Sequence, residues 1–585
     1  MQKYRVPLSV SQTNNMGKKA MVLRLVIAAL IALEAQGAEL LKNGGFESLD
    51  SWECSNIHCA LTSVKHSGSH GLEISGRQHS YEGPAQHIHV TPGHAYHASA
   101  WVKLLNNPGN TNGETLELEL DFLFNDNTHL YKSAAVHHNT YVGSDWIHLI
   151  GDFTAPSKSI TSTRFYIKGP EPSTNYVVDD ASVTSGGGSQ SQQGINATNS
   201  VIDKIRKSDI HVQVTLASHI NTADVNIHVL QTRKAFPFGT AVAASKYNEN
   251  VSGGKYRDFI HTHFNWAVLE NALKWPHLEP HRGDKHFQDA LDTINGLRKH
   301  GIKVRGHNLV WSVPNKVQDW IKALSGNELR TVVKQHITET LQKTHGLLEH
   351  WDVNNENLHG TWYQDTLHDP DYDLELFNMT HHIDSHVKLF LNDYSVVSGG
   401  STDRYLHQAQ RFKAAHVGLY GLGVQCHFYT VPSYQVIKDR LDTLAKAGVP
   451  LWVTELTVNS NHDENKGADL FEQTLRALYG HPAVEGILLW GFWDHAQYRP
   501  ERSSLVRGDN VELTAAGRRV LDLWENQWMT DDTRVLSQTG NQYTVRGFHG
   551  DYEVRVIYKG HELTQLKKTF TLGKADHTVT VSVHA

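Results

Sequence analysis

The chain has 585 residues, a formal net charge of -7 and an ordinary hydrophobic content of 39%. This length exceeds what one hydrophobic core usually supports, so we expect two or more domains. The charge balance provides no basic surface for nucleic acid or for an anionic membrane, and neither is expected as a partner.

The segment 1–37 has the order of a secretory signal. Two lysines precede the apolar run Leu25 to Leu33, and small residues follow up to Gly37, where cleavage is expected. The run is too short to span a bilayer, and no other stretch approaches that length. The sequence therefore predicts a secreted, extracellular protein, with translation starting at either Met1 or Met16.

The three cysteines fit an exported chain that does not depend on disulfides for its fold. Cys54 and Cys59 lie close together and are expected to pair, whereas Cys426 stands alone in an apolar strand and is expected to be a packed thiol. Their spacing lacks the further ligands of a zinc site.

Residues 38–184 have the pattern of a β-sandwich. Leu116, Leu118, Leu120 and Phe122 alternate with acidic residues, which is the period of a half-buried antiparallel strand. Similar runs recur at short spacing, as they do in sandwich domains.

The ends of this segment resemble those of carbohydrate-binding modules of the family 4, 9 and 22 type. The motifs are Asn-Gly-Gly-Phe-Glu at 43–47 and Tyr-Val-Val-Asp-Asp-Ala-Ser-Val at 176–183. The resemblance implies a jelly-roll-like sandwich whose opening and closing strands pair, and it puts Glu47 and Asp180 near a structural calcium ion. Our candidates for sugar contact are Arg77 and Tyr81 on a predicted turn, because a guanidinium donates hydrogen bonds and an exposed aromatic ring stacks on sugar. An Arg and a Tyr on a turn are equally typical of a surface without any binding role.

Segment 185–199 interrupts this periodicity. It begins Ser-Gly-Gly-Gly-Ser-Gln-Ser-Gln-Gln-Gly, which cannot bury enough surface to stay ordered, so we expect a flexible linker.

Two further β segments lie on either side of the remaining chain, at 200–235 and 529–585. Each contains alternating strands with no helix between them. Because the two ends of a closed barrel lie side by side, we infer that these segments join in one small accessory β unit.

Residues 236–528 alternate apolar strands with helical segments, such as 287–300 and 329–344. This size and rhythm are typical of a (β/α)8 TIM barrel, which places an active site at the C-terminal strand ends. The predicted strands are 236–242, 263–269, 303–310, 348–355, 387–394, 421–428, 451–455 and 486–490. The fold class is therefore multidomain: a β-sandwich, a TIM barrel and an accessory β unit.

Two glutamates fall at ends of predicted barrel strands, Glu356 after 348–355 and Glu455 in 451–455. Glycoside hydrolysis needs two carboxylates facing a sugar from opposite sides. One protonates the leaving oxygen, and the other attacks the sugar or activates water.

These motifs resemble glycoside hydrolase family 10, the retaining endo-β-1,4-xylanases, and are closest to its plant and animal branch. Asn355-Glu356 matches the acid/base motif and Thr454-Glu455-Leu456 the nucleophile motif. The resemblance implies that Glu356 is the proton donor and later the base, that Glu455 is the nucleophile, and that no cofactor is needed for catalysis. Retention also implies carboxyl groups about 5 to 5.5 Å apart.

The resemblance extends to the residues that would bind sugar or orient the carboxylates. His427 would hydrogen-bond the nucleophile and Gln425 would lie near Glu356, since alternate residues of one strand share a face. Asn355 would bond the sugar 2-hydroxyl. The other implied substrate contacts are Glu270, Asn271, Lys274, His307, Trp311, Trp490 and Tyr498.

Three departures from the family pattern bear on specificity. Thr457 stands where the family usually has Asp, Tyr498 stands where a second tryptophan often lies, and the loop after Trp311 differs. Glucan differs from xylan by a hydroxymethyl group on each sugar ring, and a bulky side chain in the site can exclude that group. The phenol of Tyr498 is narrower than an indole and would leave room for it, so the sequence does not decide between xylan and glucan.

The sequence thus predicts a secreted, monomeric, retaining endo-β-1,4-xylanase acting on a β-1,4-linked plant polysaccharide. One alternative is a β-1,4-glucanase, or a mixed enzyme, with the same site. The other is a non-catalytic protein that only binds glycan.

Overall fold

The computed structural model of the chain describes residues 38–105, 114–140, 146–185, 192–428, 433–458, 464–497 and 503–584. The predicted signal segment 1–37 and Tyr498 lie outside these residues. The chain divides into two compact units, Met1–Ser189 and Gln190–Ala585. Within the described ranges, no helix combines the length and apolarity that crossing a membrane requires.

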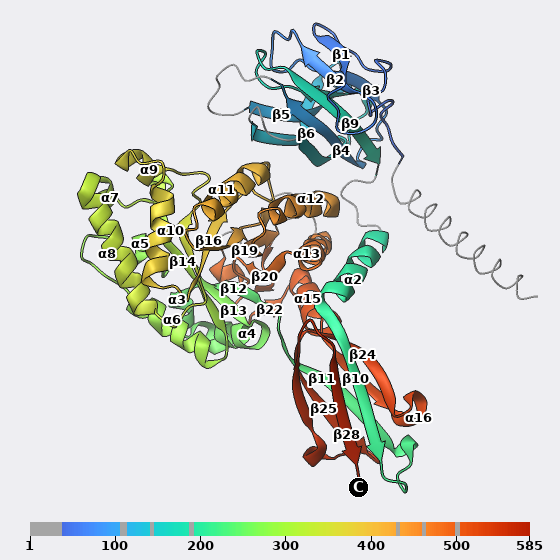
Figure 1. Ribbon diagram of the computed structural model, residues 1–585, viewed down its shortest axis with the longest axis vertical. Helices are drawn as coiled ribbons and strands as arrows, with labels where there is room; N and C mark the ends of the chain where they lie inside the picture. Colours follow the sequence, from blue (N-terminus) through green and yellow to red (C-terminus); the bar gives the residue numbers. More distant parts are fainter. Residues whose placement is uncertain are drawn as a thin grey trace, which may run out of the picture. The chain divides into compact units, whose positions relative to one another are not determined.

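The first unit is the predicted β-sandwich, with two antiparallel sheets in the orders β1-β2-β9-β4-β7 and β3-β8-β5-β6 (Figure 1). Its opening residues pair with its last strand, because Leu40 N–H donates to the Val183 carbonyl at 2.8 Å. The predicted disulfide between Cys54 and Cys59 is present. The strands are β1 (His58–Thr62), β2 (Gly71–Ser75), β3 (Ala85–Ile88), β4 (Ala95–Leu104), β5 (Glu114–Phe124), β6 (His129–Thr140), β7 (Ile147–Thr154), β8 (Ile160–Lys168) and β9 (Tyr176–Ser185).

The prediction of a flexible linker over 185–199 is wrong from Gln192 onward, because helix α2 (Gln192–Arg206) begins there. Its C-terminal half is fixed by contacts with residues distant in the sequence. Ile202 is buried in the barrel core, and the Arg206 guanidinium donates to the carbonyls of Tyr479, His481 and Val484 at 2.7–3.0 Å. Composition alone misses such contacts, and the first residues of 200–235 are helical for the same reason.

The predicted pairing of the chain's two β ends is confirmed. β10 (Lys207–Leu216) lies between β24 (Gln542–Phe548) and β28 (His577–Val583), and β11 (Val225–Lys234) lies between β23 (Asp531–Val535) and β25 (Gly550–Tyr558). Figure 1 shows these green and red strands side by side. β26 (His561–Glu562) and β27 (Lys568–Leu572) complete a two-sheet unit with its own apolar core.

The second unit also contains the predicted TIM barrel. Its parallel strands follow one another around the sheet, and β17 pairs with β19 to close it. The strands are β12 (Phe238–Val242), β13 (Trp266–Leu269), β14 (Lys303–Trp311), β15 (His350–Asn355), β16 (Lys388–Asp393), β17 (Leu419–Val424), β19 (Leu451–Val458) and β20 (Val484–Leu489). All the predicted strand positions are confirmed within a few residues.

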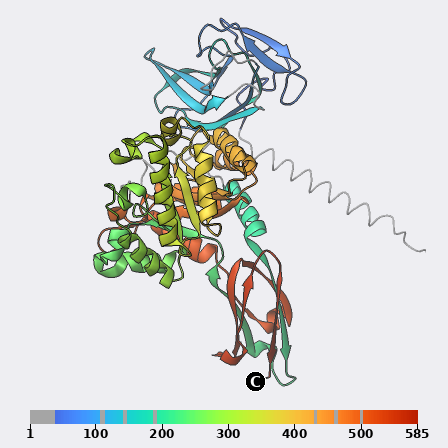
Figure 2. The ribbon, with the colours of Figure 1, turned by 60° about the vertical axis from the view of Figure 1, so that its left-hand side comes forward.

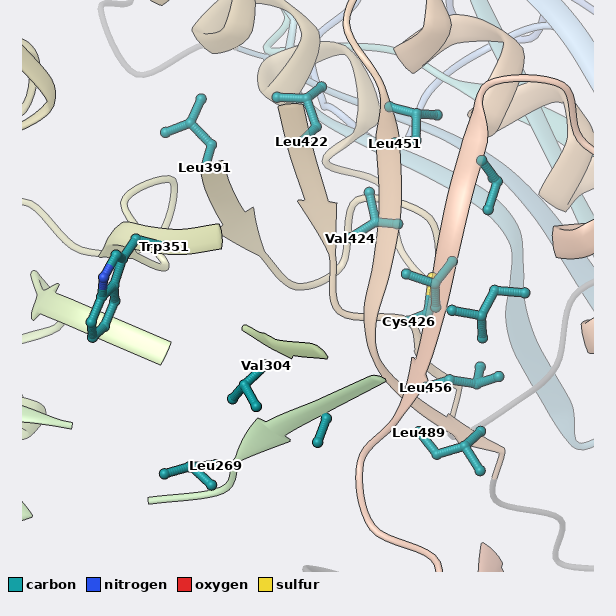
Figure 3. Close-up of a cluster of buried hydrophobic side chains, with 14 of the residues drawn as sticks. Leu269, Val304, Trp351, Leu391, Leu422, Val424, Cys426, Leu451, Leu456 and Leu489 are labelled. Carbon is teal, nitrogen blue, oxygen red and sulfur yellow. The ribbon is translucent and has the colours of Figure 1, made fainter. Parts of the chain in front are cut away.

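Helices form the outer layer of the barrel (Figures 1 and 2). They pack on apolar residues of the strands, including those in Figure 3. The helices are α3 (Ala244–Asn248), α4 (Lys255–His263), α5 (Trp275–Leu278), α6 (Gln288–Lys299), α7 (Asp319–Lys322), α8 (Gly326–Thr344), α9 (Trp362–Leu367), α10 (Tyr372–Ile383), α11 (Thr402–Ala414), α12 (Tyr434–Ala445), α13 (Glu464–Tyr479) and α15 (Ala515–Leu521).

One predicted strand is interrupted where the site lies. β17 ends at Val424, and a two-residue strand, β18 (His427–Phe428), then pairs with β19. Between them the buried Cys426 has a φ of 59°, in the left-handed region that few non-glycine residues adopt. Gln425 and His427 therefore reach the site from a strand end and a second short strand, and not from one face of one strand.

Candidate active site

A cleft of about 990 Å³ lies at the C-terminal ends of the barrel strands. Eleven of the predicted site residues line it, and the twelfth, Tyr498, is outside the described residues. The eleven are Glu270, Asn271, Lys274, His307, Trp311, Asn355, Glu356, Gln425, His427, Glu455 and Trp490.

Glu356 follows β15 and lies in a largely buried environment with two hydrogen-bond donors. Trp311 Nε1 donates to Oε2 at 2.9 Å, and Gln425 Nε2 donates to Oε1 at 3.2 Å. Burial, followed by the charge of Glu455, raises the pKa of Glu356 above its usual value despite these two bonds. A carboxyl held in this way suits a general acid.

Glu455, on β19, has the opposite character although it is 5% exposed. Asn392 Nδ2 donates to its Oε1 at 2.9 Å, and His427 Nε2 lies 3.1 Å from its Oε2. Burial acts to raise the pKa of Glu455, but the hydrogen bond from His427 and the charges of His307, His427 and Lys274 lower it to about 2. This carboxylate stays ionised at the pH where Glu356 is protonated, which divides the roles of acid and nucleophile.

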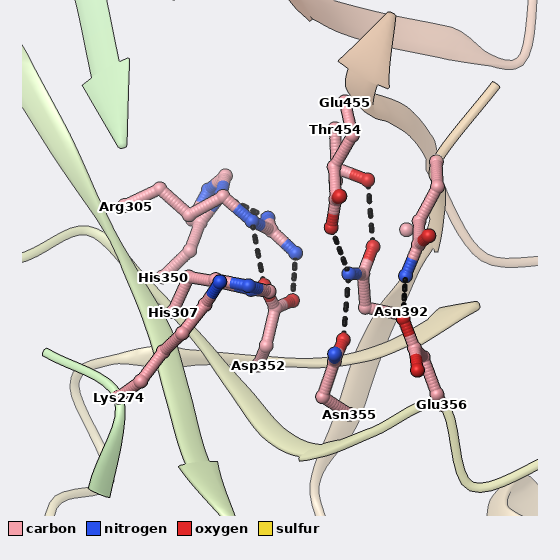
Figure 4. Close-up of polar contacts among 12 residues, drawn as sticks. Lys274, Arg305, His307, His350, Asp352, Asn355, Glu356, Asn392, Thr454 and Glu455 are labelled. Carbon is pink, nitrogen blue, oxygen red and sulfur yellow. Dashed lines mark hydrogen bonds and ion pairs between the residues drawn. The ribbon is translucent and has the colours of Figure 1, made fainter. Parts of the chain in front are cut away.

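Asn392 links the two catalytic strands and was not predicted from the sequence. Its Nδ2 donates to Asn355 Oδ1 as well as to Glu455, each at 2.9 Å, while Thr454 Oγ1 donates to its Oδ1 at 2.6 Å (Figure 4). Asn355 Oδ1 is thereby occupied, which leaves its own amide N–H groups for a substrate hydroxyl. The signal was available, since Asn392 is polar and lies at the end of a predicted barrel strand.

His307 is oriented by a buried ion pair beneath the cleft. The Arg305 guanidinium bonds to Asp352, and the Asp352 Oδ2 lies 2.9 Å from His307 Nδ1. Because an ionised carboxylate can only accept, His307 must donate from Nδ1, and its Nε2 is free to face the cleft. Figure 4 shows Arg305 and His307 of β14 beside Asp352, which lies on β15, the strand that ends at Asn355 just before Glu356.

Next to His307, whose ring lies 5.3 Å from that of Trp490, the cleft joins cationic and aromatic side chains. Lys274 Nζ donates to Asn271 Oδ1 at 2.9 Å and lies 5.1 Å from the Trp311 ring and 5.4 Å from the Trp490 ring. Burial lowers the pKa of Lys274, while the charges of Glu455, Glu270 and Glu356 oppose that effect. Ring faces and fixed donors of this kind suit a sugar ring with its hydroxyl groups.

Residues 228–522 match the profile of glycosyl hydrolase family 10. The chain belongs to this family. It is 31% identical over 492 residues to "Endo-1,4-beta-xylanase 2" of Arabidopsis thaliana, covering 83% of this chain and 44% of that protein. It is 30% identical over 525 residues to "Endo-1,4-beta-xylanase 3" of the same plant, covering 88% and 67%. The chain thus spans about half to two thirds of the length of these relatives.

Among solved structures, the fold is similar to that of xylanase 10B from Thermotoga petrophila in complex with xylobiose. The TM-score is 0.46 at 24% identity, covering 50% of this chain and 94% of that one.

Two orienting contacts implied by family 10 are confirmed, namely His427 with Glu455 and Gln425 with Glu356. The sugar-binding roles of the cleft residues and the separation of the two carboxyl groups stay predictions. Thr457, where the family usually has Asp, places its hydroxyl 3.1 Å from His427 Nδ1.

The N-terminal unit matches a carbohydrate binding domain over residues 38–175. The prediction that Arg77 is a surface sugar contact is wrong, because its side chain is buried. Its guanidinium donates to the backbone carbonyls of Pro170, Glu171 and Thr174 at 2.7–2.8 Å. It fixes the 170–174 loop instead. Tyr81 is 58% exposed and stacks on His79, so it stays a predicted contact.

Glu47 and Asp180 both bond to the segment 66–70. Glu47 Oε1 accepts from Ser69 N–H at 2.6 Å, and Asp180 accepts from Ser67 Oγ and lies beside His66 Nδ1, both at 2.7 Å. Among the described residues, no three His, Cys, Asp or Glu side chains converge on one point. Calcium takes six to eight oxygen ligands, of which the site would supply these two carboxylates, and the calcium stays a prediction.

The outer face of the sheet β3-β8-β5-β6 is a candidate sugar surface that sequence reasoning missed. Tyr131 on β6 is 58% exposed, and on the next strands Tyr166 Oη donates to Glu119 at 2.7 Å while Lys168 pairs with Glu117 and Glu119 at 2.8 Å. Register places Tyr166, Glu119 and Ser133 in one row across three strands. These residues are far apart in the sequence, so only the strand pairing shows that they share a face.

Proposed function

We propose that the chain is an endo-β-1,4-xylanase that cleaves with retention of configuration through Glu455 and Glu356. The observation that carries this proposal is the opposite displacement of the two carboxyl pKa values in one cleft, with Glu356 raised and Glu455 lowered to about 2. A proton donor and an ionised nucleophile are therefore available together, as double displacement requires.

The two steps follow from these protonation states. Ionised Glu455 attacks the anomeric carbon while Glu356 gives its proton to the departing glycosidic oxygen, and an ester between sugar and Glu455 forms. Glu356, now a carboxylate, then takes a proton from water as the water oxygen attacks the same carbon and Glu455 departs. The protein's own side chains balance every proton in this sequence.

The choice of xylan rests on family membership and on the two plant relatives, both called endo-1,4-beta-xylanase. To test it, one preparation is incubated with xylan, carboxymethyl-cellulose and mannan, and reducing ends are measured. Xylan should be cleaved fastest, and proton NMR should detect the β-anomer as the first product. Faster release from carboxymethyl-cellulose would favour the glucanase, and binding without release would favour a glycan-binding protein.

We also propose that the protein is secreted, on the evidence of the signal-like segment 1–37. Expression with that segment should deliver active protein to the medium, with a mature end near Ala38. Activity retained inside the cells would contradict export.

For the N-terminal unit, we propose that the exposed face around Tyr131 holds the polymer and raises its effective concentration at the cleft. Tyr131→Ala should weaken retention on insoluble xylan, because a ring face stacks on sugar. Tyr81→Ala is the matched control, since the two tyrosines are equally exposed. Loss of binding only in the Tyr81 variant would assign the contact to the turn instead.

A further inference from the structure

The ring of His427 is bracketed by two residues of the same strand. Glu455 and Thr457 are alternate residues of β19, so their side chains project from one face, and β18 pairs His427 directly with Thr457. Glu455 Oε2 lies 3.1 Å from His427 Nε2, and Thr457 Oγ1 lies 3.1 Å from His427 Nδ1. Every hydrogen-bonding atom of the ring is therefore engaged by this strand.

The Thr457 hydroxyl can hold the ring through either state of Nδ1. For Nε2 to donate to the carboxylate of Glu455, that nitrogen must hold a proton. Nδ1 is then either a second donor or an acceptor. A hydroxyl can accept from the first and donate to the second, whereas a carboxylate could only accept.

The alternative partner of the Thr457 hydroxyl is weaker. It can also donate to the backbone carbonyl of Glu455, but that contact is 3.4 Å, against 3.1 Å to His427 Nδ1. Bonds from a hydroxyl weaken toward such lengths, so the ring is its nearer and stronger partner.

We propose that Thr457 is a positioning residue whose hydroxyl hydrogen-bonds His427 Nδ1 and so holds the ring with its Nε2–H directed at the nucleophile Glu455. This inference rests on the proposed retaining mechanism.

Other charged groups also face this pair, and they bear on any pH effect. Glu455 is faced by Lys274 from the loop after β13, by His307 from β14 and by Glu356 from the end of β15. The Thr457 hydroxyl contacts His427 and the backbone carbonyl of Glu455, so a change confined to Thr457 acts on this pair.

The test compares Thr457→Val, which keeps the shape and removes the hydroxyl, with Thr457→Ser, which restores it. In Thr457→Val the ring loses the hydrogen bond that holds its Nε2–H toward Glu455, so kcat on an aryl xylobioside should fall by about tenfold, the effect of one lost hydrogen bond. KM should change less, and the acid limb of the kcat/KM profile should move to higher pH, because a donor to a carboxylate lowers its pKa. Thr457→Ser should recover kcat and the acid limb to within about threefold and a few tenths of a pH unit.

Thermal unfolding separates positioning from packing. If Thr457→Val and Thr457→Ser lose kcat equally, or if the loss follows the melting temperature with an unchanged acid limb, the hydroxyl does not position the ring. An inactive parent enzyme would instead refute the proposed function, so the two failures are distinguishable.

Discussion

Replacing Asn392 should weaken the nucleophile Glu455, because Asn392 acts on it through a hydrogen bond and needs no contact with the substrate. Asn392 donates at 2.9 Å both to Glu455 and to Asn355, and Asn392→Ala removes both donors. A hydrogen bond to a charged group contributes about 1.5–3 kcal/mol, so kcat/KM should fall by about 10- to 150-fold.

The pH profile gives the sign of the effect independently. A donor favours the ionised form, so its removal raises the pKa of Glu455, and the acid limb of kcat/KM should move to higher pH by about one to two units. Asn392→Asp should move it further, because it sets a second carboxylate against Glu455.

Thr454→Val is the matched control. It removes the bond that Thr454 gives to Asn392 Oδ1 at 2.6 Å but leaves both donated bonds in place. Its loss should stay well below that of Asn392→Ala at a comparable melting temperature. Activity of Asn392→Ala within twofold of the parent and an unmoved acid limb would refute the reasoning.

The remaining predictions concern the division of labour, the electrostatic coupling and the attached module. Glu356→Ala should abolish xylan cleavage but spare the first step on aryl glycosides with good leaving groups, which need no proton; equal losses on both would contradict its role as acid. Glu455→Gln should lower the pKa of Glu356, followed by carbon-13 NMR of the carboxyl, because the charge of Glu455 is one cause of its elevation; an unchanged titration would mean that burial acts alone. Deleting residues 38–185 should weaken activity on insoluble xylan and leave short oligosaccharides almost unaffected, and an equal loss on both would make the module part of the barrel's stability. Soluble β-1,4-glucan should be cleaved more slowly than xylan, and Tyr498→Trp should lower the glucan-to-xylan ratio of kcat/KM; complete inactivity on glucan would refute an open wall at that position.

The barrel and its two glutamates could be predicted because they follow from local pattern. Parallel strands buried on both faces give continuous apolar runs, and polar residues at their ends mark the site. Asn392 obeys the same rule, but its polarity alone does not distinguish it from other polar residues near strand ends. Its importance comes from bonds to strands distant in the sequence, which the strand-end pattern does not contain.

The errors have a common physical origin in contacts between distant segments. Helix α2 is fixed by Arg206 bonding to carbonyls near residue 480, and Arg77 is buried by a loop near residue 170. Cys426 adopts its left-handed conformation inside the packed barrel, which breaks the strand that carries Gln425 and His427. Composition and periodicity describe neighbours in the chain, so they cannot show such pairings.

The most direct test of the account is to trap the covalent intermediate. A 2-fluoro xylobioside with an activated leaving group slows the second step, and mass spectrometry of the digested enzyme then locates the sugar. We expect one equivalent of sugar attached to Glu455, and Glu455→Gln should not be labelled. An enzyme that cleaves xylan without forming this adduct, and whose first product is the α-anomer, would show inversion and contradict Glu455 as the nucleophile.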